Sequence, residues 1–524
     1  MSDEMFDVVQ IGWGPVSKVL AMMLARQGRR VAVFERHATP YTMPRAVCID
    51  HEMYRTLHAA GFAAEVEAVC DPAPLYQWFN ADWKKLLEID WTQESISGGP
   101  EVNFVHQPTL EAALDRAVRA RPEVEVNLGW QAVRLSQTAD YAEVDVKNVT
   151  TGEIRTVRGR YIVGCDGANS FVRESLGIGR EDLGFEADWL VIDMLLNEGL
   201  THESLGIPAA GQYCNPVRPT TIVPGGIQNG RVCRRWEFMR LPHETRADME
   251  STEAVWRLLG RWVKPDQAEL VRHTIYTFRS LIAEQWRVGR VLLAGDAAHL
   301  MPPFMGQGMC AGFRDAWNIS WKLGRVLDSE ADDSLLDTYM PERRPHVTEI
   351  IKASIFLGQI ICVPDPEKAA ERDRAFLSGE VPPPPPFPWL TEGFLHDPSR
   401  DPLAGRLSPH GHVRDGERTA RFDDVAGTRF HVISRGDARA ALTPDQRATL
   451  ERLGAVCIDV GPPDDTRDGT VVDLDGKFVP FMREAGVAAM IVRPDYYVFG
   501  SSASLAGLAG VVDALDAAAA RYGM

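Results

Sequence analysis

A glycine turn between an apolar run and a helical pattern is the feature that most constrains the fold of this chain. The apolar run over residues 6–11 ends at Gly12, and residues 15–27 then show the apolar spacing of a helix. A second apolar run over residues 31–34 ends on Glu35. This order predicts a strand, a helix and a parallel strand, which is the βαβ unit of an α/β domain.

The turn itself, Gly12-Trp-Gly-Pro-Val-Ser17, carries the first two glycines of a dinucleotide fingerprint. Gly12 permits the tight turn, and Gly14 lets the backbone approach a pyrophosphate at the helix N-terminus. Glu35 ends the next strand, where its carboxylate can accept a hydrogen bond from a ribose hydroxyl. Ser17 replaces the third glycine and is small enough for close packing. The motif predicts a dinucleotide site, and a structural turn in an unrelated α/β protein is the alternative.

Length, charge and cysteine content limit the number of domains and the kinds of partner that can be expected. The chain has 524 residues, 45% of them apolar, and its 56 basic and 73 acidic side chains give a formal charge of −17. About three domains are expected at roughly 100 to 200 residues each. The negative charge argues against nucleic acid or an anionic membrane surface as the main partner. The eight cysteines include no CxxC pair, so neither a metal site nor a redox dithiol is expected.

The cysteine pattern and the first residues of the chain indicate the cellular compartment of the protein. Single cysteines fit a reducing compartment, and the acidic start of the chain lacks the basic and apolar parts of a signal peptide. The apolar stretch 503–520 contains Asp513 and Asp516, which favours a packed helix over a membrane span. We therefore expect a cytoplasmic protein without a membrane partner.

Changes of pattern along the chain predict three domains. Two further buried strands, 160–164 and 290–294, resemble those of the first unit, whereas the segment between them is β-rich at 213–223 and 234–239 and has an amphipathic helix at 248–263. Five consecutive prolines within Val381–Pro388 form a stiff spacer before another α/β unit. The predicted domains are a discontinuous nucleotide-binding domain (1–180 and 281–380), an inserted β-sheet domain (181–280) and a C-terminal domain (389–524).

The apolar runs of the last domain predict its strands, which are followed by a terminal helix. They are 430–433, 455–460, 488–492 and 496–499, with a hairpin at 493–495.

Two more motifs follow the later nucleotide-type strands. The first is Cys165-Asp-Gly-Ala-Asn-Ser170, and the second runs from Gly289 through Gly295-Asp296 to His299 and on through Pro302-Pro-Phe-Met-Gly-Gln-Gly-Met309. Asp296 at a strand end can hold a ribityl hydroxyl. The turn before Met309 opens a helix whose N–H groups can stabilise negative charge on a ligand.

Together the three motifs resemble the FAD-dependent aromatic hydroxylases, the single-component monooxygenases typified by para-hydroxybenzoate hydroxylase and phenol hydroxylase. The resemblance covers nearly the whole chain and is greatest to 3-(3-hydroxyphenyl)propionate hydroxylases. It rests there on four stretches: Met301-Pro-Pro-Phe304, Asn215-Pro-Val-Arg-Pro219, Arg235-Trp-Glu-Phe238 and Val492-Arg-Pro-Asp-Tyr496.

This resemblance implies an α/β architecture with a Rossmann-like FAD-binding domain, an inserted β-sheet substrate domain and a thioredoxin-like C-terminal domain. Because Cys457 is alone, the last domain is expected to pack or to form a homodimer rather than to do redox work. The resemblance also implies FAD contacts at Gly12, Trp13, Gly14, Pro15, Val16, Glu35, Arg36, Arg45, Gln107, Val133, Asp166, Gly295, Asp296, Pro303, Gly306, Gly308 and Met309. The turn at Asp166 would also serve the nicotinamide donor.

The reaction implied by the resemblance is hydroxylation of a phenolic ring. NADPH or NADH reduces FAD, and O2 then forms a flavin C4a-hydroperoxide that transfers oxygen to the ring. A phenol with a pKa near ~10 is activated when an acceptor takes its proton. Asp50, His51, Tyr213 and Arg218 are the polar candidates: Asp50 or Tyr213 as the acceptor, and Arg218 as the ligand of a substrate carboxylate. Alternatively, Asp50 caps a helix and Arg218 forms an ion pair.

Other functions are compatible with the same fold. If the substrate is larger than a single-ring phenol, the enzyme would be a tailoring hydroxylase of a polycyclic aromatic natural product. A catalytically silent FAD module, acting as a scaffold or redox sensor, is the alternative of another class. A flavin halogenase ranks low because the chain has no Trp-x-Trp-x-Ile-Pro run.

Overall fold

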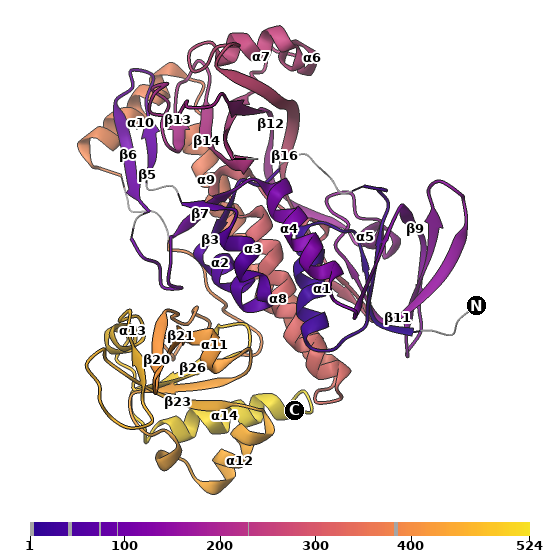
Figure 1. The fold of residues 1–524 in the computed structure, drawn as a ribbon, viewed down its shortest axis with the longest axis vertical. Helices are drawn as coiled ribbons and strands as arrows, with labels where there is room; N and C mark the ends of the chain where they lie inside the picture. Colours follow the sequence, from indigo (N-terminus) through magenta and orange to yellow (C-terminus); the bar gives the residue numbers. More distant parts are fainter. Residues whose placement is uncertain (1–4, 40–44, 73–74, 92, 229, 382–385) are drawn as a thin grey trace.

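The computed structural model describes the chain except residues 1–4, 40–44, 73–74, 92, 229 and 382–385. The first four residues and most of the predicted polyproline spacer therefore lie outside the described residues. The remaining chain folds around two eight-stranded sheets, one seven-stranded sheet and one three-stranded sheet (Figure 1).

The first sheet has the parallel core that the glycine turn predicted. Its parallel strands lie in the order β8-β2-β1-β11-β18, which is the 3-2-1-4-5 order of a dinucleotide-binding sheet. They are β1 (Met5–Ile11), β2 (Val31–Glu35), β8 (Val124–Leu128), β11 (Ile154–Gly164) and β18 (Val291–Leu293); β9 (Trp130–Gln137), β10 (Ala142–Asn148) and β17 (Arg287–Val288) pair antiparallel at the sides.

Three helices pack together beside this sheet. The predicted first helix is α1 (Pro15–Arg26), and it contacts both α4 (Gln107–Arg119) and α8 (Gly308–Leu327). A Cβ at Gly312 of α8 would lie 2.5 Å from the side chain of Val16, so the glycine permits a close approach of the two helices. Because α8 is covered along nearly its whole length, polar residues on it are held inside the protein.

The second sheet extends beyond the predicted insert. It contains the two long strands β12 (Arg180–Leu196) and β16 (Ala268–Ala283), and its order is β19-β16-β12-β15-β14-β13-β5-β6. The hairpin β5 (Leu75–Phe79) and β6 (Lys85–Asp90) joins it from the N-terminal part of the chain through a parallel pairing of β5 with β13. The short strand β19 (His299–Leu300) completes the other edge.

Two segments of this sheet domain differ in detail from the prediction. The β-rich stretch 213–223 is two strands, β13 (Gly211–Tyr213) and β14 (Thr220–Gln228), joined by a turn; β15 (Arg231–Met239) follows. The predicted helix 248–263 is broken into α6 (Arg246–Glu250) and α7 (Thr252–Leu259). Ser251 causes the break, because its side chain caps the second helix by accepting from the N–H of Ala254 at 3.2 Å.

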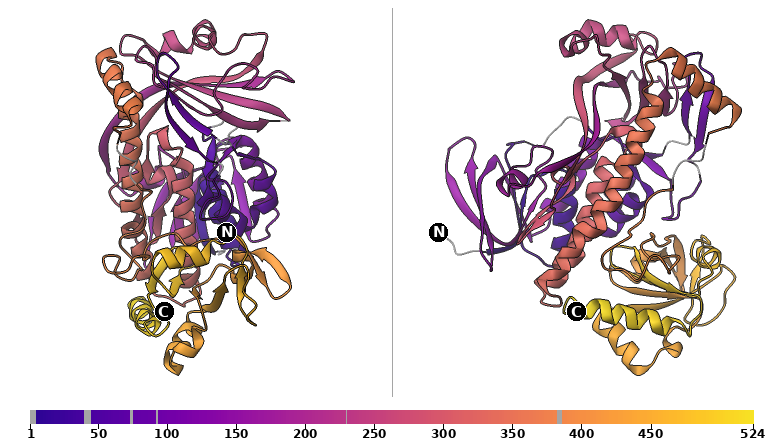
Figure 2. Two further views of the ribbon diagram at one scale, coloured as in Figure 1. Left: turned by 90° about the vertical axis from the view of Figure 1, so that its left-hand side faces the viewer. Right: turned by 180° about the vertical axis from the view of Figure 1, so that it is seen from behind.

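A three-stranded sheet and short helices connect the two large sheets. The strands are β3 (Cys48–Asp50), β7 (Val102–Val105) and β4 (Cys70–Pro72), and the helices are α2 (His51–Leu57), α3 (Ala63–Glu67) and α5 (Phe171–Ser175). The long α9 (Tyr339–Ile361), followed by α10 (Pro366–Ser378), extends towards the second sheet (Figures 1 and 2).

The C-terminal domain has a thioredoxin-like core. Strands β22 (His431–Ser434) and β23 (Val456–Gly461) are parallel, and β25 (Ala489–Val492) and β26 (Val498–Ser502) continue the sheet antiparallel in the order β23-β22-β25-β26. The remaining elements are β20 (His412–Asp415), β21 (Arg418–Arg421), β24 (Val471–Asp473), α11 (Phe422–Ala426), α12 (Pro444–Arg452), α13 (Phe478–Glu484) and α14 (Leu508–Ala520).

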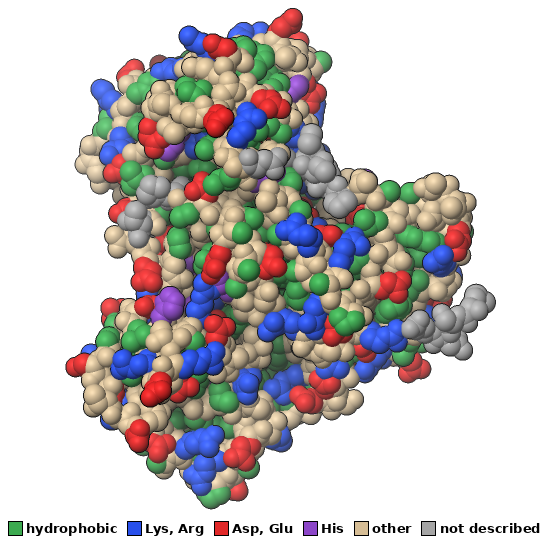
Figure 3. Space-filling view, in the orientation of Figure 1, with side chains coloured by type: hydrophobic (Ala, Val, Ile, Leu, Met, Phe, Trp, Pro, Cys, Tyr) green, Lys and Arg blue, Asp and Glu red, His purple; other side chains and the backbone are tan. Residues whose placement is uncertain are grey.

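Buried polar contacts dock this domain on the first one. Arg493 binds Glu342 of α9 at 2.7 Å, and Arg55 of α2 binds Asp423 at 2.7 Å; all four side chains are buried. The face in Figure 3 shows basic and acidic side chains interspersed over both domains. The two buried ion pairs therefore attach the C-terminal domain to the first domain.

No single helix in the described part of the chain has the length and apolar character needed to cross a membrane. One sharply bent pair, Asp333–Ile361 with Pro366–Ser378, meets that test only when its two helices are taken together.

Candidate active site

The turn from β1 to α1 leaves open space above a helix N-terminus. Gly12 has a φ of +99°, and a Cβ there would lie 2.4 Å from the carbonyl oxygen of Cys165, so the turn packs directly on the end of β11. Within the described residues, a Cβ at Gly14 would have no neighbour within 4 Å, and no side chain caps the first turn of α1. Free N–H groups and open space together form a site for an anion such as pyrophosphate.

Glu35 is fixed at the end of β2, next to this turn. Its carboxylate accepts from the N–H groups of Trp13 and His37, both at 2.9 Å. Carboxylate oxygens have further lone pairs, so hydroxyl groups of a ligand can still donate to Glu35. The Trp13 side chain is buried, and its indole N–H donates to Asp115 at 2.6 Å. Trp13 thus presents its backbone, and not its side chain, to the candidate site beside Glu35.

Asp296 lies in the turn that follows β18. Gly295 has a φ of +61°, and its N–H donates to the buried Asp315 at 3.0 Å. Asp315 also binds His299 at 2.7 Å and Arg343 at 3.0 Å, which fixes the turn to α8. The Asp296 side chain remains accessible and makes no hydrogen bond to a described residue.

The N-terminus of α8 is a second open helix end. Gly306 has a φ of +65°, and a Cβ there would lie 2.6 Å from the sulfur of Cys48. No side chain that the structure describes caps the helix, and the nearest described atom to a Cβ at Gly308 would be 3.9 Å away, on Met301. This end therefore also offers N–H groups to a ligand.

Asp166 has the environment of a ligand-binding group. One carboxylate oxygen accepts from the N–H of Val172 at 3.0 Å, and the other is buried with no hydrogen-bond partner among the described residues. Burial raises the pKa of Asp166. Since buried polar atoms are normally paired, this orphaned oxygen fits a donor from a bound molecule.

The other predicted cofactor residues divide into two groups. Gln107 is occupied, because its oxygen accepts from the N–H groups of Arg45 and Ala46 at 2.7 and 2.6 Å, and its amide donates to Glu111. Its observed role is to hold the segment that carries Arg45. Most of the second group lies around the same strand ends: Pro15 and Val16 in the first turn of α1, Arg36 exposed after β2, and Pro303 and Met309 beside the open end of α8. Val133 is exposed in the middle of β9.

Asp50, a predicted catalytic residue, is held by protein groups on both oxygens. One oxygen caps α2 by accepting from the N–H of Met53 at 2.9 Å, and the other binds Arg314 at 2.5 Å. Burial would raise its pKa, but Arg314 and His51 outweigh that effect and hold the pKa below its ordinary value. Asp50 is therefore an ion-paired helix cap, which matches the structural alternative for this residue. Its neighbour His51 contacts Ser97 at 3.0 Å.

The second sheet presents one face to the nucleotide-type domain and the other to its own core. On the first face, Arg235 donates to the carbonyl of Arg45 at 2.5 Å, and Val223 packs beside Cys48. On the opposite face, Ile222 and Trp236 pack against α7. Alternation along each strand decides which side chains meet the candidate site.

Tyr213 points to the far face of this sheet. Its ring stacks on Trp83 with centroids 4.5 Å apart, and its hydroxyl bonds the carbonyl of Ala81 at 3.2 Å. The adjacent Gln212 is on the inner face, where it donates to the Tyr76 hydroxyl at 2.8 Å. The structure thus does not bring Tyr213 to Asp50, because a shift of one residue along a strand reverses the face.

Arg218 lies in the turn between β13 and β14 and has a carboxylate partner. It binds Glu244 through two nitrogens at 2.5 and 2.7 Å and donates to the carbonyl of Met239 at 2.8 Å. The bidentate pair occupies the guanidinium that we expected to bind a substrate carboxylate.

The inner face carries polar residues that the sequence did not single out, chiefly Gln212, Tyr76 and Glu237. The alternation in Arg235-Trp-Glu-Phe238 contained a signal for Glu237, since it places Arg235 and Glu237 together and opposite Trp236. The sequence did not show which face of the second sheet meets the nucleotide-type domain.

Comparisons with known proteins cover both parts of this architecture. A family model described as "FAD binding domain" matches residues 5–354, and one described as "HcaD C-terminal domain" matches residues 405–518. The chain is 36% identical over 520 residues to a probable NADH-specific resorcinol 4-hydroxylase of Rhodococcus jostii (strain RHA1), with 98% of this chain and 95% of that protein covered. The chain belongs to the FAD-dependent aromatic hydroxylases.

Two further similarities place this aromatic hydroxylase among its relatives. It is 34% identical to a 3-(3-hydroxy-phenyl)propionate/3-hydroxycinnamic acid hydroxylase of Mycobacterium sp. (strain KMS), over 94% of this chain and 88% of that one. The solved structure of the flavin-dependent monooxygenase PieE with FAD and substrate matches its fold with a TM-score of 0.79 at 21% identity, covering 99% and 100% of the two chains.

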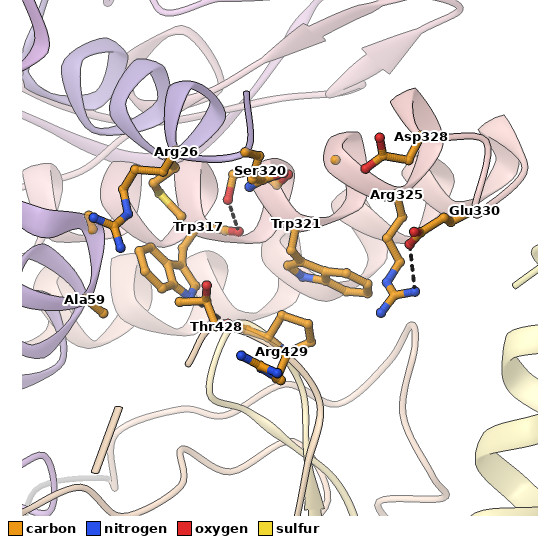
Figure 4. Close-up of a pocket in the computed structure, with 15 residues that line it drawn as sticks. Arg26, Ala59, Trp317, Ser320, Trp321, Arg325, Asp328, Glu330, Thr428 and Arg429 are labelled. Carbon is orange, nitrogen blue, oxygen red and sulfur yellow. Dashed lines mark hydrogen bonds and ion pairs between the residues drawn. The ribbon is translucent and has the colours of Figure 1, made fainter. Parts of the chain in front are cut away.

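A pocket of the hydroxylase lies away from the nucleotide-binding motifs. It is a cavity of about 280 Å³ between α1, α8 and the C-terminal domain, with Trp317 and Trp321 on one side and Thr428 and Arg429 on the other (Figure 4). None of the predicted FAD or catalytic residues lines it. The pocket is therefore a feature of the domain contact and separate from the candidate active site.

Proposed function

We propose that this hydroxylase acts on a small neutral phenol of the resorcinol type, with NADH as reductant and O2 as oxidant. Support comes from the relative named for resorcinol, which is 36% identical, whereas the hydroxyphenylpropionate hydroxylases are 31–34% identical. The name of that relative also specifies NADH. The overall reaction converts the phenol, O2, NADH and a proton into the hydroxylated phenol, NAD⁺ and water.

The choice of a neutral ring rests on one structural observation. The arginines named on or near the substrate sheet already have carboxylate partners within the chain: Arg218 binds Glu244, and both Arg235 and Arg272 bind Asp193. A substrate carboxylate would have to displace one of these partners. Breaking a buried pair typically costs about 3–5 kcal/mol, so a ring without a carboxylate fits the site better.

The open strand and helix ends fit FAD. We assign its pyrophosphate to the turn at Gly12–Val16, its adenosine to Glu35 and its ribityl chain to Asp296, with the N-terminus of α8 facing the flavin ring. When bound, FAD takes two electrons from the nicotinamide and uses them to activate O2 for transfer of one oxygen atom. Two uncapped helix ends, the accessible Asp296 and the orphaned oxygen of Asp166 support this assignment.

The protein contributes orientation, exclusion of water and control of one proton. Attack by an electrophilic oxygen needs electron density on the ring, which a phenol gains as its hydroxyl proton is drawn off. Aromatic side chains on the inner face, among them Tyr76 stacked on Trp91 at 4.9 Å and Trp189 against Phe304 at 5.6 Å, provide a water-poor wall.

Substrate-dependent oxidation of NADH tests the proposal. Resorcinol, 3-(3-hydroxyphenyl)propionate and a polycyclic phenol are each added to the FAD-loaded enzyme, and products are identified by mass spectrometry. We expect resorcinol to stimulate NADH oxidation most and to be hydroxylated. A preference for the carboxylated or the polycyclic compound would overturn the substrate assignment. No stimulation by any phenol would favour the silent FAD scaffold.

A further inference from the structure

Glu237 is a buried carboxylate on the inner face of the substrate sheet. It lies on β15, and 7% of the residue is accessible. It lies opposite Thr221 of β14, on the face where Val223 packs beside Cys48, and Cys48 in turn contacts the carbonyl of Gly306 at 3.8 Å. Glu237 therefore faces the segment that leads to the open N-terminus of α8.

The carboxylate of Glu237 lacks the partners expected at this depth. It makes no hydrogen bond to a described residue, and the nearest basic nitrogen among those residues belongs to Arg235, at 3.8 Å. Arg235 itself is directed to Asp193 at 2.7 Å and to the carbonyl of Arg45 at 2.5 Å. Since buried carboxylates are normally well bonded, Glu237 is available to a donor from outside the chain.

Neighbouring groups are unsuited to accept a proton. Arg314 pairs with Asp50 at 2.5 Å and, acting against burial, holds the pKa of Asp50 below its ordinary value, which makes Asp50 the weaker base. Burial raises the pKa of Cys48 to about 12, so the thiol stays protonated. The hydroxyl of Tyr276 already accepts from Arg272 at 2.7 Å.

We propose that Glu237 is the catalytic residue that accepts the hydroxyl proton of the phenolic substrate. The O–H bond of the phenol breaks, its electron pair stays on the phenol oxygen, and the proton bonds to a carboxylate oxygen of Glu237. The proton passes to water when the product leaves. This role rests on the proposed function, since it requires a phenolic substrate on this face.

The electrostatic setting supports the role. Burial raises the pKa of Glu237, and Asp193 acts in the same direction, whereas Arg235 and Arg272 lower it. A raised carboxyl pKa lies nearer to that of a phenol, which improves a general base as long as it remains ionised at the working pH. Activity is therefore expected to fall as acid protonates Glu237.

The test compares Glu237→Gln with the wild-type holoenzyme and with Glu269→Gln. Glu269 is exposed on β16 of the same sheet and pairs with Arg231, which makes it a matched control. We expect Glu237→Gln to lose ~10² to 10⁴-fold of the product-forming rate and to lose the acid limb of the pH profile, while resorcinol-stimulated NADH oxidation continues and yields peroxide. FAD content and the melting temperature check that the variant is folded.

Further measurements distinguish a failure of the proposed role of Glu237 from a failure of the proposed function. Product formation within threefold of wild type in Glu237→Gln overturns the role of Glu237, whereas a wild-type enzyme that hydroxylates no phenol overturns the proposed function instead. If Glu237→Gln does not fold, Glu237→Asp replaces it, and an unchanged acid limb in that variant contradicts the role. Loss of product in Asp50→Asn with retention in Glu237→Gln would assign the proton to Asp50.

Discussion

Carboxylates of the same type acquire different roles here because their partners differ. Asp50 is bound on both oxygens, Asp315 binds three groups, and Asp296 has no hydrogen bond to a described residue. A carboxylate with a full set of donors supports the fold, whereas one left open at a strand end can serve a ligand. At the scale of single residues, hydrogen-bond occupancy thus distinguishes Asp296 from Asp50 and Asp315.

Removal of the Asp296 carboxylate tests this distinction. Asp296→Ala should weaken FAD binding by about 1.5–3 kcal/mol, or roughly 10 to 150-fold in Kd, because a hydrogen bond to a charged group is lost. Fold stability of the apoprotein should change little, since no described residue donates to Asp296. Titration of apoprotein with FAD, followed by flavin fluorescence, measures the Kd. Asp140→Ala, in an exposed turn, is the control, and equal affinity in both variants would contradict the placement of the ribityl chain.

Glu35 gives a second test at the adenosine end of FAD. Its oxygens also hold the N–H groups of Trp13 and His37, so Glu35→Gln keeps one acceptor but loses the charge. We expect weaker binding of FAD and of ADP, whereas Asp296→Ala should weaken FAD only. Calorimetry with both ligands distinguishes the two ends, and unchanged ADP binding in Glu35→Gln would show that adenosine lies elsewhere.

At the scale of elements, strand ends were predictable and strand faces were not. The glycine turn, Glu35 and the Gly295-Asp296 turn fall at strand ends because apolar runs and glycines mark those positions directly. Tyr213 and Glu237 depended on which face of a two-sided sheet meets the other domain, and both faces carry apolar residues. The hairpin β5–β6 joined the second sheet by a parallel pairing with β13, a long-range contact that has no local pattern.

Arg314 joins three elements and provides a test at this scale. From α8 it binds Asp50, which caps α2, and Glu52 at 2.6 Å within α2, and it donates to Gln307 at 2.8 Å before the helix. Arg314→Met leaves two buried carboxylates without their cation, so unfolding free energy should fall by about 3–5 kcal/mol. Urea denaturation measures the loss. Arg344→Met, which removes an exposed pair with Glu181, should cost less than about 1 kcal/mol, and similar losses in both variants would contradict this role.

At the scale of the whole molecule, buried contacts join the C-terminal domain to the rest of the hydroxylase, and we predict that its thiol takes no part in the reaction. Cys457 lies on β23, half-buried, and burial raises the pKa of its thiol, which disfavours the reactive thiolate. Cys457→Ser should therefore retain the rate of substrate hydroxylation and the FAD content of wild type. A large loss of turnover in a folded Cys457→Ser protein would show that this domain takes part in the chemistry.

Acid should weaken the contact between the C-terminal domain and the rest of the molecule. Glu342 is buried between Lys322 and Arg493; burial would raise its pKa, but the two cations outweigh it and lower the pKa to about 2. Arg55 and His410 likewise overcome burial and hold the pKa of Asp423 below its ordinary value. Because these folded-state values lie below those of the unfolded chain, the stabilisation is complete above about pH 4.5 and is lost as pH falls towards 2.

Fluorescence of Trp317 and Trp321, which lie at the domain contact, should change in this range. Asp423→Asn should lower stability at neutral pH and flatten the acid dependence, and an unchanged pH profile in that variant would show that another contact holds the domains together.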